Sequence, residues 1–171
     1  MEPTCARETR LLTLRPMRVW VFSILAAAVS CTQATGGYDT GIAIANTTWD
    51  PGTTAMGVTG AVKQSGSITF YFYPQAPGTT PVTYTTHAGS PGAGLDASGN
   101  LPSGSTYVAL LSKILADAGV TADFGGYIVV ITNFTNAHCL FVLSNFTTFS
   151  QGALGLVIYE PRAGGGEALE H

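Results

Sequence analysis

The chain has few cysteines, few charges and no long apolar run, and each shortage excludes a class of protein. Only 10% of its 171 residues are charged, and its three cysteines are Cys5, Cys31 and Cys139. The apolar run from Val19 to Val29 spans eleven residues. A transmembrane helix needs roughly twenty, so no stable membrane span is expected.

Basic residues are scarce beyond this run. Four precede it and three follow it: Arg7, Arg10, Arg15 and Arg18, then Lys63, Lys113 and Arg162. Against eight acidic residues after position 34, three basic ones leave that part of the chain with a net charge of −5. Nucleic acids and anionic membranes are recognised by clustered Lys and Arg, so neither is an expected partner.

The amino-terminal segment has the pattern of a signal peptide. An arginine-containing stretch precedes the apolar run, and the small residues Thr32 and Ala34 suit a signal peptidase. We therefore expect a leader over residues 1–34, beginning at Met1 or Met17, and a secreted chain located in the periplasm, on the outer surface or outside the cell. Lipid attachment at Cys31 is the alternative, which Ala28 disfavours because a larger aliphatic residue is usual there.

Removal of this leader would leave 137 residues, enough for one hydrophobic core. Cys139 would be the sole cysteine, so no intrachain disulfide could form. It lies in an apolar run without adjacent cations, which indicates a structural core residue rather than a reactive thiol.

Three apolar runs near the carboxyl end predict strands. The run 127–132 is apolar on both faces and β-branched, as a central strand is, and a turn at 133–137 leads into the run 139–143. We expect these two runs to form a hairpin. The run 154–159 ends before Pro161 and can pair with either of them.

The stretch Ser67–Tyr73 alternates strictly between two faces and predicts an amphipathic strand. The run 82–86 is its expected hairpin partner. Tyr71, Tyr73 and Tyr84 are the candidate ligand face, with an ordinary solvated strand face as the alternative.

Residues 87–104 form a Gly-, Pro- and Ser-rich loop, longer than is usual in a small domain. Its Gly92-Ala93-Gly94 imitates a dinucleotide fingerprint but lacks the preceding strand and following helix. One helix is predicted after the loop, capped by Ser105 or Thr106 and ended by Gly119.

These patterns predict a mainly β fold, an antiparallel β-sandwich with one short helix. The expected domain covers residues 35–161, and the glycine-rich segment 162–171 is expected to be disordered. The expected core includes four apolar residues from different strands: Phe70, Val130, Phe141 and Leu156.

No reactive constellation stands out. The chain has no Gly-x-Ser-x-Gly elbow, and a serine base could only be His87 or His138. His138 and Cys139 are adjacent in a strand and point to opposite faces, so they do not chelate one metal. We interpret His138 as structural and expect no metal or cofactor. Four aspartates could pair for glycoside hydrolysis, but linear order does not show it: Asp50, Asp96, Asp117 and Asp123.

Several motifs together resemble a group of uncharacterised secreted bacterial proteins. They are Asp39–Thr47, Gly125–Ile128, Asn133-Phe134 followed by Ala137-His138, and Gly152–Val157. The resemblance covers residues 38–170 and implies bacterial secretion without implying a reaction. The chain departs from it at Cys139-Leu140, where a glycine and an aromatic are expected, and in lacking a cysteine in 67–73. The disulfide that would join these two regions in relatives is absent here.

We therefore expect a secreted, non-catalytic surface or binding module for an unknown extracellular ligand or cell-surface component. An extracellular carbohydrate-active hydrolase is the alternative. Two carboxylates converging in a cleft, or His138 with serine and aspartate, would favour the enzyme, whereas an aromatic surface would favour binding.

Overall fold

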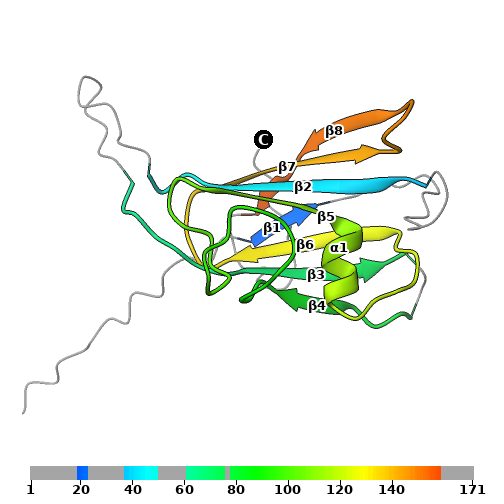
Figure 1. The fold of residues 1–171 in the computed structure, drawn as a ribbon, viewed down its shortest axis with the longest axis horizontal. Coiled ribbons are helices and arrows are strands. Elements are labelled where there is room, and N and C mark those ends of the chain that lie inside the picture. The colour runs from blue at the N-terminus through cyan, green and yellow to red at the C-terminus, as the bar shows by residue number, and fades with distance from the viewer. Residues whose placement is uncertain (1–18, 23–36, 50–60, 76–77, 159–171) are drawn as a thin grey trace, which may run out of the picture.

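The computed structural model describes residues 19–22, 37–49, 61–75 and 78–158, which form a two-layered β-sandwich (Figure 1). One sheet has the order β4-β3-β6-β1-β9, with strands at Val82–Thr85, Ile68–Pro74, Gly126–Thr132, Val19–Phe22 and Leu156–Ile158. The other has the order β5-β2-β7-β8, with strands at Thr106–Leu110, Asp39–Asn46, Ala137–Ser144 and Ser150–Leu154. Helix α1, Leu111–Asp117, follows β5 and packs beside β2 and β5. The predicted mainly antiparallel sandwich with one short helix is confirmed.

Strict alternation of side chains explains how the two layers meet. Ile68, Phe70 and Phe72 of β3 are fully buried, whereas the residues between them are only partly covered. In β2 the buried side chains include Ile42 and Ile44. A period of two places each set on one face of its sheet, so the two apolar faces pack against each other.

Phe70 lies at the centre of this core. Its ring centroid is 6.0 Å from Phe72 and 6.2 Å from Tyr84 in its own sheet. It is also 6.3 Å from Tyr107, which belongs to the opposite sheet. One aromatic side chain therefore contacts both layers.

Strand β6 is central, as its two-sided apolar pattern predicted, and it pairs with β3 and β1. The expected hairpin between β6 and β7 is wrong, because β7 pairs with β2 and β8 in the other sheet. The segment 133–136 crosses between the layers. The Asn133 N–H donates to Ser67 O at 3.0 Å, and the Thr47 N–H donates to Asn136 O at 3.1 Å. Turn-forming residues here connect two sheets instead of two neighbouring strands.

The last apolar run is divided between the sheets. It ends β8 at Leu154, continues through Gly155, and supplies β9, which pairs with β1. Strand β1 lies within the predicted leader and is hydrogen-bonded to both β6 and β9. The remainder of the predicted leader, including Cys31, and the tail 162–171 lie outside the described residues.

Helix α1 begins later than expected. Residues 106–110 form β5 because Tyr107 pairs with Ile44 and is fully buried between the layers. The helix ends before Gly119, whose φ of +79° favours glycine, as predicted. No helix in the described ranges is long and apolar enough to cross a membrane.

The predicted core residues have different outcomes. Phe70 and Val130 are fully buried, while Phe141 is partly buried and packs against the core. The side chain of Leu156 lies outside the described part of the chain.

Phe70→Ala should lower the free energy of unfolding by about 3–5 kcal/mol, because it leaves a cavity between the layers. A urea titration measures this loss. Val108→Ala is the matched control, since Val108 is 50% exposed and its truncation should change stability by no more than about 0.5 kcal/mol. A loss below about 1 kcal/mol for Phe70→Ala would contradict its central position.

Candidate functional site

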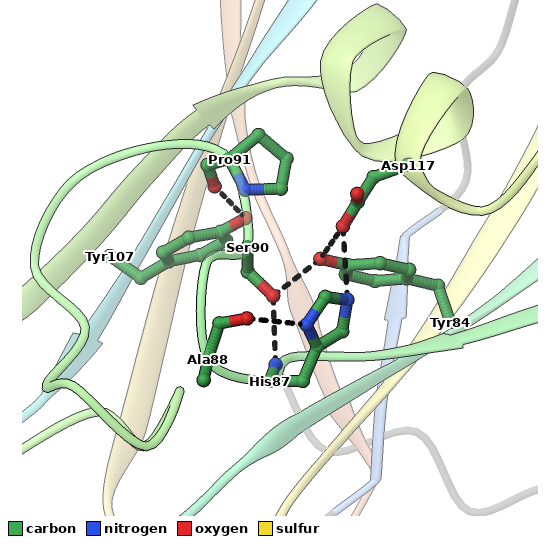
Figure 2. Close-up of polar contacts among 7 residues, drawn as sticks. All are labelled: Tyr84, His87, Ala88, Ser90, Pro91, Tyr107 and Asp117. Atoms are coloured by element: carbon green, nitrogen blue, oxygen red, sulfur yellow. Dashed lines mark hydrogen bonds and ion pairs between the residues drawn. The ribbon is translucent and has the colours of Figure 1, made fainter.

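Two regions of the described chain gather polar or aromatic side chains. The first, here called the polar ring, consists of Tyr84, His87, Ser90 and Asp117 (Figure 2). Tyr84 comes from β4 and Asp117 from the end of α1. His87 and Ser90 begin the long loop that follows β4.

The hydrogen bonds of the polar ring form a closed circuit. The Tyr84 hydroxyl oxygen lies 2.6 Å from Ser90 Oγ and 2.8 Å from Asp117 Oδ2. A phenol has one proton, so Tyr84 donates to the carboxylate and accepts from Ser90. The His87 backbone N–H donates to Ser90 Oγ at 2.7 Å, and His87 Nε2 lies 3.1 Å from Asp117 Oδ2. The circuit returns to His87, so each member has a partner.

This geometry differs from that of a nucleophilic serine. A catalytic histidine takes the serine proton directly, whereas here the Ser90 proton goes to Tyr84. The two His87 ring nitrogens face other groups: Nδ1 is 2.9 Å from Ala88 O, and Nε2 faces Asp117. Neither nitrogen serves Ser90 as a base. The polar ring instead fastens the start of the long loop to α1.

Burial keeps the tyrosines of this region neutral. The pKa of Tyr84 is raised to about 12: desolvation is the largest cause, the Ser90 donor lowers the pKa, and the bond to Asp117 raises it. Desolvation also raises the pKa of Tyr107, whose hydroxyl donates to Pro91 O at 2.8 Å. Both phenols are therefore proton donors that hold the loop at neutral pH.

The second region, the Trp49 cavity, is an open hollow of about 300 Å³ at the end of β2. Its described lining residues are all uncharged: Ala45, Asn46, Thr47, Trp49, Gly104, Ser105 and Thr106. The Trp49 side chain is 59% exposed. A large aromatic surface thus stands beside hydroxyl groups in an open hollow.

A buried amide network holds the base of this cavity. Asn46 is 1% exposed, and its Nδ2 donates to Gln64 O at 2.8 Å and Leu101 O at 3.0 Å. Its Oδ1 accepts from the Thr48 hydroxyl at 2.6 Å and from the Thr48 N–H at 3.1 Å. Both donors and both acceptor sites of the Asn46 amide are used. Thr48, which immediately precedes Trp49, is therefore held in place.

Trp49 itself is constrained by two neighbours. Gly104 has φ of +77°, and a Cβ there would lie 3.0 Å from the indole, so a side chain would crowd the ring. Lys63 Nζ lies 3.7 Å from the ring centroid, a cation–π contact, but Lys63 does not line the cavity. Both neighbours restrain the indole, and Lys63 places a positive charge over one face of the ring.

The three tyrosines expected to share a ligand face do not share one. Tyr84 is 5% exposed and pairs with Phe70, so it points into the core, opposite to Tyr71 and Tyr73. The strand register explains this correction, because cross-strand partners share a face. Tyr73 instead stacks on Tyr127 at a centroid distance of 4.7 Å.

The structure places the two residues interpreted as structural on opposite faces of β7. Cys139 is buried, and desolvation strongly raises the pKa of its thiol, so the thiolate is disfavoured. His138 is exposed and pairs in register with Ala45. Among the described residues, no group of three or more His, Cys, Asp or Glu could hold a metal ion.

Two of the carboxylates considered for glycoside hydrolysis, Asp96 and Asp117, make separate contacts. Asp96 accepts two N–H groups of its own turn, from Ser98 and Asn100, both at 2.9 Å. Asp117 belongs to the polar ring. Asp50 lies outside the described residues.

Sequence reasoning missed both Trp49 and the partnership of His87 with Asp117. Trp49 had a usable signal, since a tryptophan between a strand and a Pro-Gly turn is poorly placed to be buried. The His87–Asp117 contact had none, because it joins residues thirty positions apart.

No family model and no curated protein matches the chain. Among solved structures, the crystal structure of Thermotoga maritima 1070 is similar, with a TM-score of 0.48 and 12% sequence identity. The alignment covers 81% of this chain and 91% of that one. What this chain does is therefore inferred from its own geometry.

Tyr84 should ionise near pH 12, later than an exposed tyrosine. Because the folded pKa is raised, its stabilising contribution is complete below about pH 10 and is lost as pH rises towards 12. Absorbance at 295 nm follows tyrosinate formation, and the difference between wild type and Tyr84→Phe isolates this group. A difference titration centred near pH 10 would show that the phenol is solvated.

Proposed function

We propose that the chain is an exported, non-catalytic module that binds a neutral saccharide in the Trp49 cavity. The observation that carries this proposal is the 59% exposed indole beside an uncharged hollow of about 300 Å³. Ligand sites begin at about this volume, and buried aromatic anchors dominate binding energies.

The lining residues suit the chemistry of a sugar. A pyranose has an apolar face of C–H groups, which can pack on an indole, and a rim of hydroxyls. Thr47, Ser105 and Thr106 offer hydroxyls that both donate and accept. The absence of charge among the described lining residues favours a neutral ligand over an acidic one.

The hydrolase alternative lacks support at this cavity. Glycoside hydrolysis generally uses two carboxyl groups about 5 to 9.5 Å apart across the scissile bond. The described lining residues of the Trp49 cavity include no carboxylate and no histidine. Binding without catalysis therefore fits them better.

Export rests on the leader pattern of residues 1–34, and it has a structural consequence. Cleavage after Ala34 would remove β1, which lies between β6 and β9. Strand β9 would lose its described partner, whereas β6 would keep β3.

Expression in a bacterial host should yield an exported product that begins near Thr35, because the apolar run is too short to remain in a bilayer. Amino-terminal sequencing of the exported and cytoplasmic fractions measures this. An uncleaved chain that stays soluble in the cytoplasm would contradict export and assign residues 19–22 to the mature sheet.

Trp49→Ala should weaken saccharide binding at least about tenfold, since it removes the aromatic anchor of the cavity. Trp20 and Trp49 are the only tryptophans, and Trp20 lies in the proposed leader. The fluorescence of the cleaved chain, or of an uncleaved Trp20→Phe chain, therefore reports on Trp49 alone. Cellohexaose, xylohexaose and maltohexaose serve as neutral probes, and calorimetry measures their affinity for the Trp49→Ala variant.

Tyr127→Ala is the matched control, because Tyr127 is a 44% exposed aromatic on β6, away from the cavity. It should bind as wild type does. Unchanged affinity in Trp49→Ala would show that saccharides do not bind in the Trp49 cavity. No response to any of the three probes would overturn the proposal for neutral glucans and xylans.

A further inference from the structure

Within the part of the chain that the structure describes, strand β8, Ser150–Leu154, is an open edge of its sheet. It pairs with β7 on one side, and no other described strand pairs with it. An edge strand presents unpaired N–H and C=O groups that can accept another strand.

In the full chain, with β1 in place, the other three edges are better protected. At β5, Ala93 exchanges two backbone hydrogen bonds with Val108, at 2.9 and 3.0 Å. Strand β4 has four residues and follows Pro81, and β9 has three residues and is followed closely by Pro161. Short strands and prolines limit edge pairing.

Strand β8 lacks such protection. The sequence from Ser144 to Ile158 contains no charged residue and no proline. Proteins commonly place lysine or proline on edges to prevent association. Two copies of β8 can therefore meet without repulsion between like charges.

Apolar groups flank β8 at both of its ends. Leu154 at one end is 78% exposed, and beyond the other end Phe149 is 40% and Phe146 65% exposed. Each end of β8 therefore carries exposed apolar side chains that a partner could cover.

The turn that carries the phenylalanines is firmly built. Asn145 Oδ1 accepts the N–H groups of Thr147, Thr148 and Phe149 at 3.1, 2.9 and 2.8 Å. Phe146 has φ of +59°, which is unfavourable for a bulky residue and persists only when neighbours enforce it. This turn, residues 145–149 and here called the aromatic turn, therefore holds both phenylalanines in fixed positions.

We propose that two copies of this chain associate through antiparallel pairing of their β8 strands. A twofold axis at Gly152 sets Leu154 of one copy opposite Ser150 of the other, next to its Phe149. Each end of one strand thus meets the opposite end of its mate, as an isologous interface requires. Because the β5 edge is covered, the pairing closes as a dimer and does not extend into a filament.

The association is tested by sedimentation velocity of the full chain over a wide concentration range. A five-residue edge gives a small interface, so monomer and dimer should exchange with dilution. Leu154→Lys adds a charge at the interface and should shift the monomer–dimer midpoint at least about tenfold. Val108→Lys, an equally feasible surface change at the covered edge of the same sheet, should leave the midpoint unchanged.

Hydrogen exchange of the wild-type chain provides a measurement that needs no variant. Amides of residues 150–154 should gain protection as concentration rises. A chain that is monomeric throughout would overturn the proposal, as would a dimer without added protection in β8. A monomer that instead sediments with phosphatidylcholine vesicles would also overturn it and assign the aromatic turn to lipid.

Discussion

The buried Asn46 amide is the interaction on which the end of the sandwich depends. It joins β2 to two backbone carbonyls from distant segments, at Gln64 and Leu101, and to the Thr48 hydroxyl. An apolar residue at position 46 would remove one donor from each carbonyl. Gln64 O would keep only the Thr48 hydroxyl at 3.2 Å, and Leu101 O only the Gly66 N–H at 3.4 Å. Both remaining bonds are longer than those from Asn46, so the two segments would be held more weakly. The position of Trp49 follows from this network.

Hydrogen bonds to polar groups also explain how the long loop after β4 becomes ordered. Its beginning is tied to α1 by the polar ring, and its end is tied to β2 by Leu101 O and by the Gly104 N–H, which donates to Asn46 O at 2.8 Å. A loop of this length loses much conformational entropy on ordering, and polar contacts at both ends offset that loss. The polar ring is thus structural, and its resemblance to a catalytic set comes from residue types alone.

The fold was largely predictable because alternation is local. The period-two pattern of Ser67–Tyr73 correctly assigned buried and outward side chains, and Gly119 correctly ended the helix. Sheet membership was not predictable at 133–136, since a turn-rich segment between two strands fits a hairpin and a crossing equally well. The local pattern also could not show where β5 ends and α1 begins. Residues 106–110 form a strand because Tyr107 pairs with Ile44 and is buried.

The candidate site was less predictable, because its parts come from distant positions. Trp49, Gly104 and Asn46 meet only after β2 and the long loop are in place. The predicted tyrosine face failed for a related reason: the register of β4 on β3, which places Tyr84 opposite Phe70, depends on the connection between the strands. Local alternation divides the side chains of each strand between two faces. It does not show which of these faces lies on the same side of the sheet as a given face of the neighbouring strand.

The direction of β2 relates the proposed saccharide site to the proposed dimer. The Trp49 cavity lies beyond the Asn46 end of β2, and the aromatic turn follows Ser144, which pairs with Asp39 at the opposite end. Antiparallel pairing of two β8 strands reverses the second copy, so its cavity comes to the far end of the joined sheet. Each dimer would then present two cavities facing apart, a geometry suited to joining two saccharide chains and unsuited to gripping one chain at neighbouring positions.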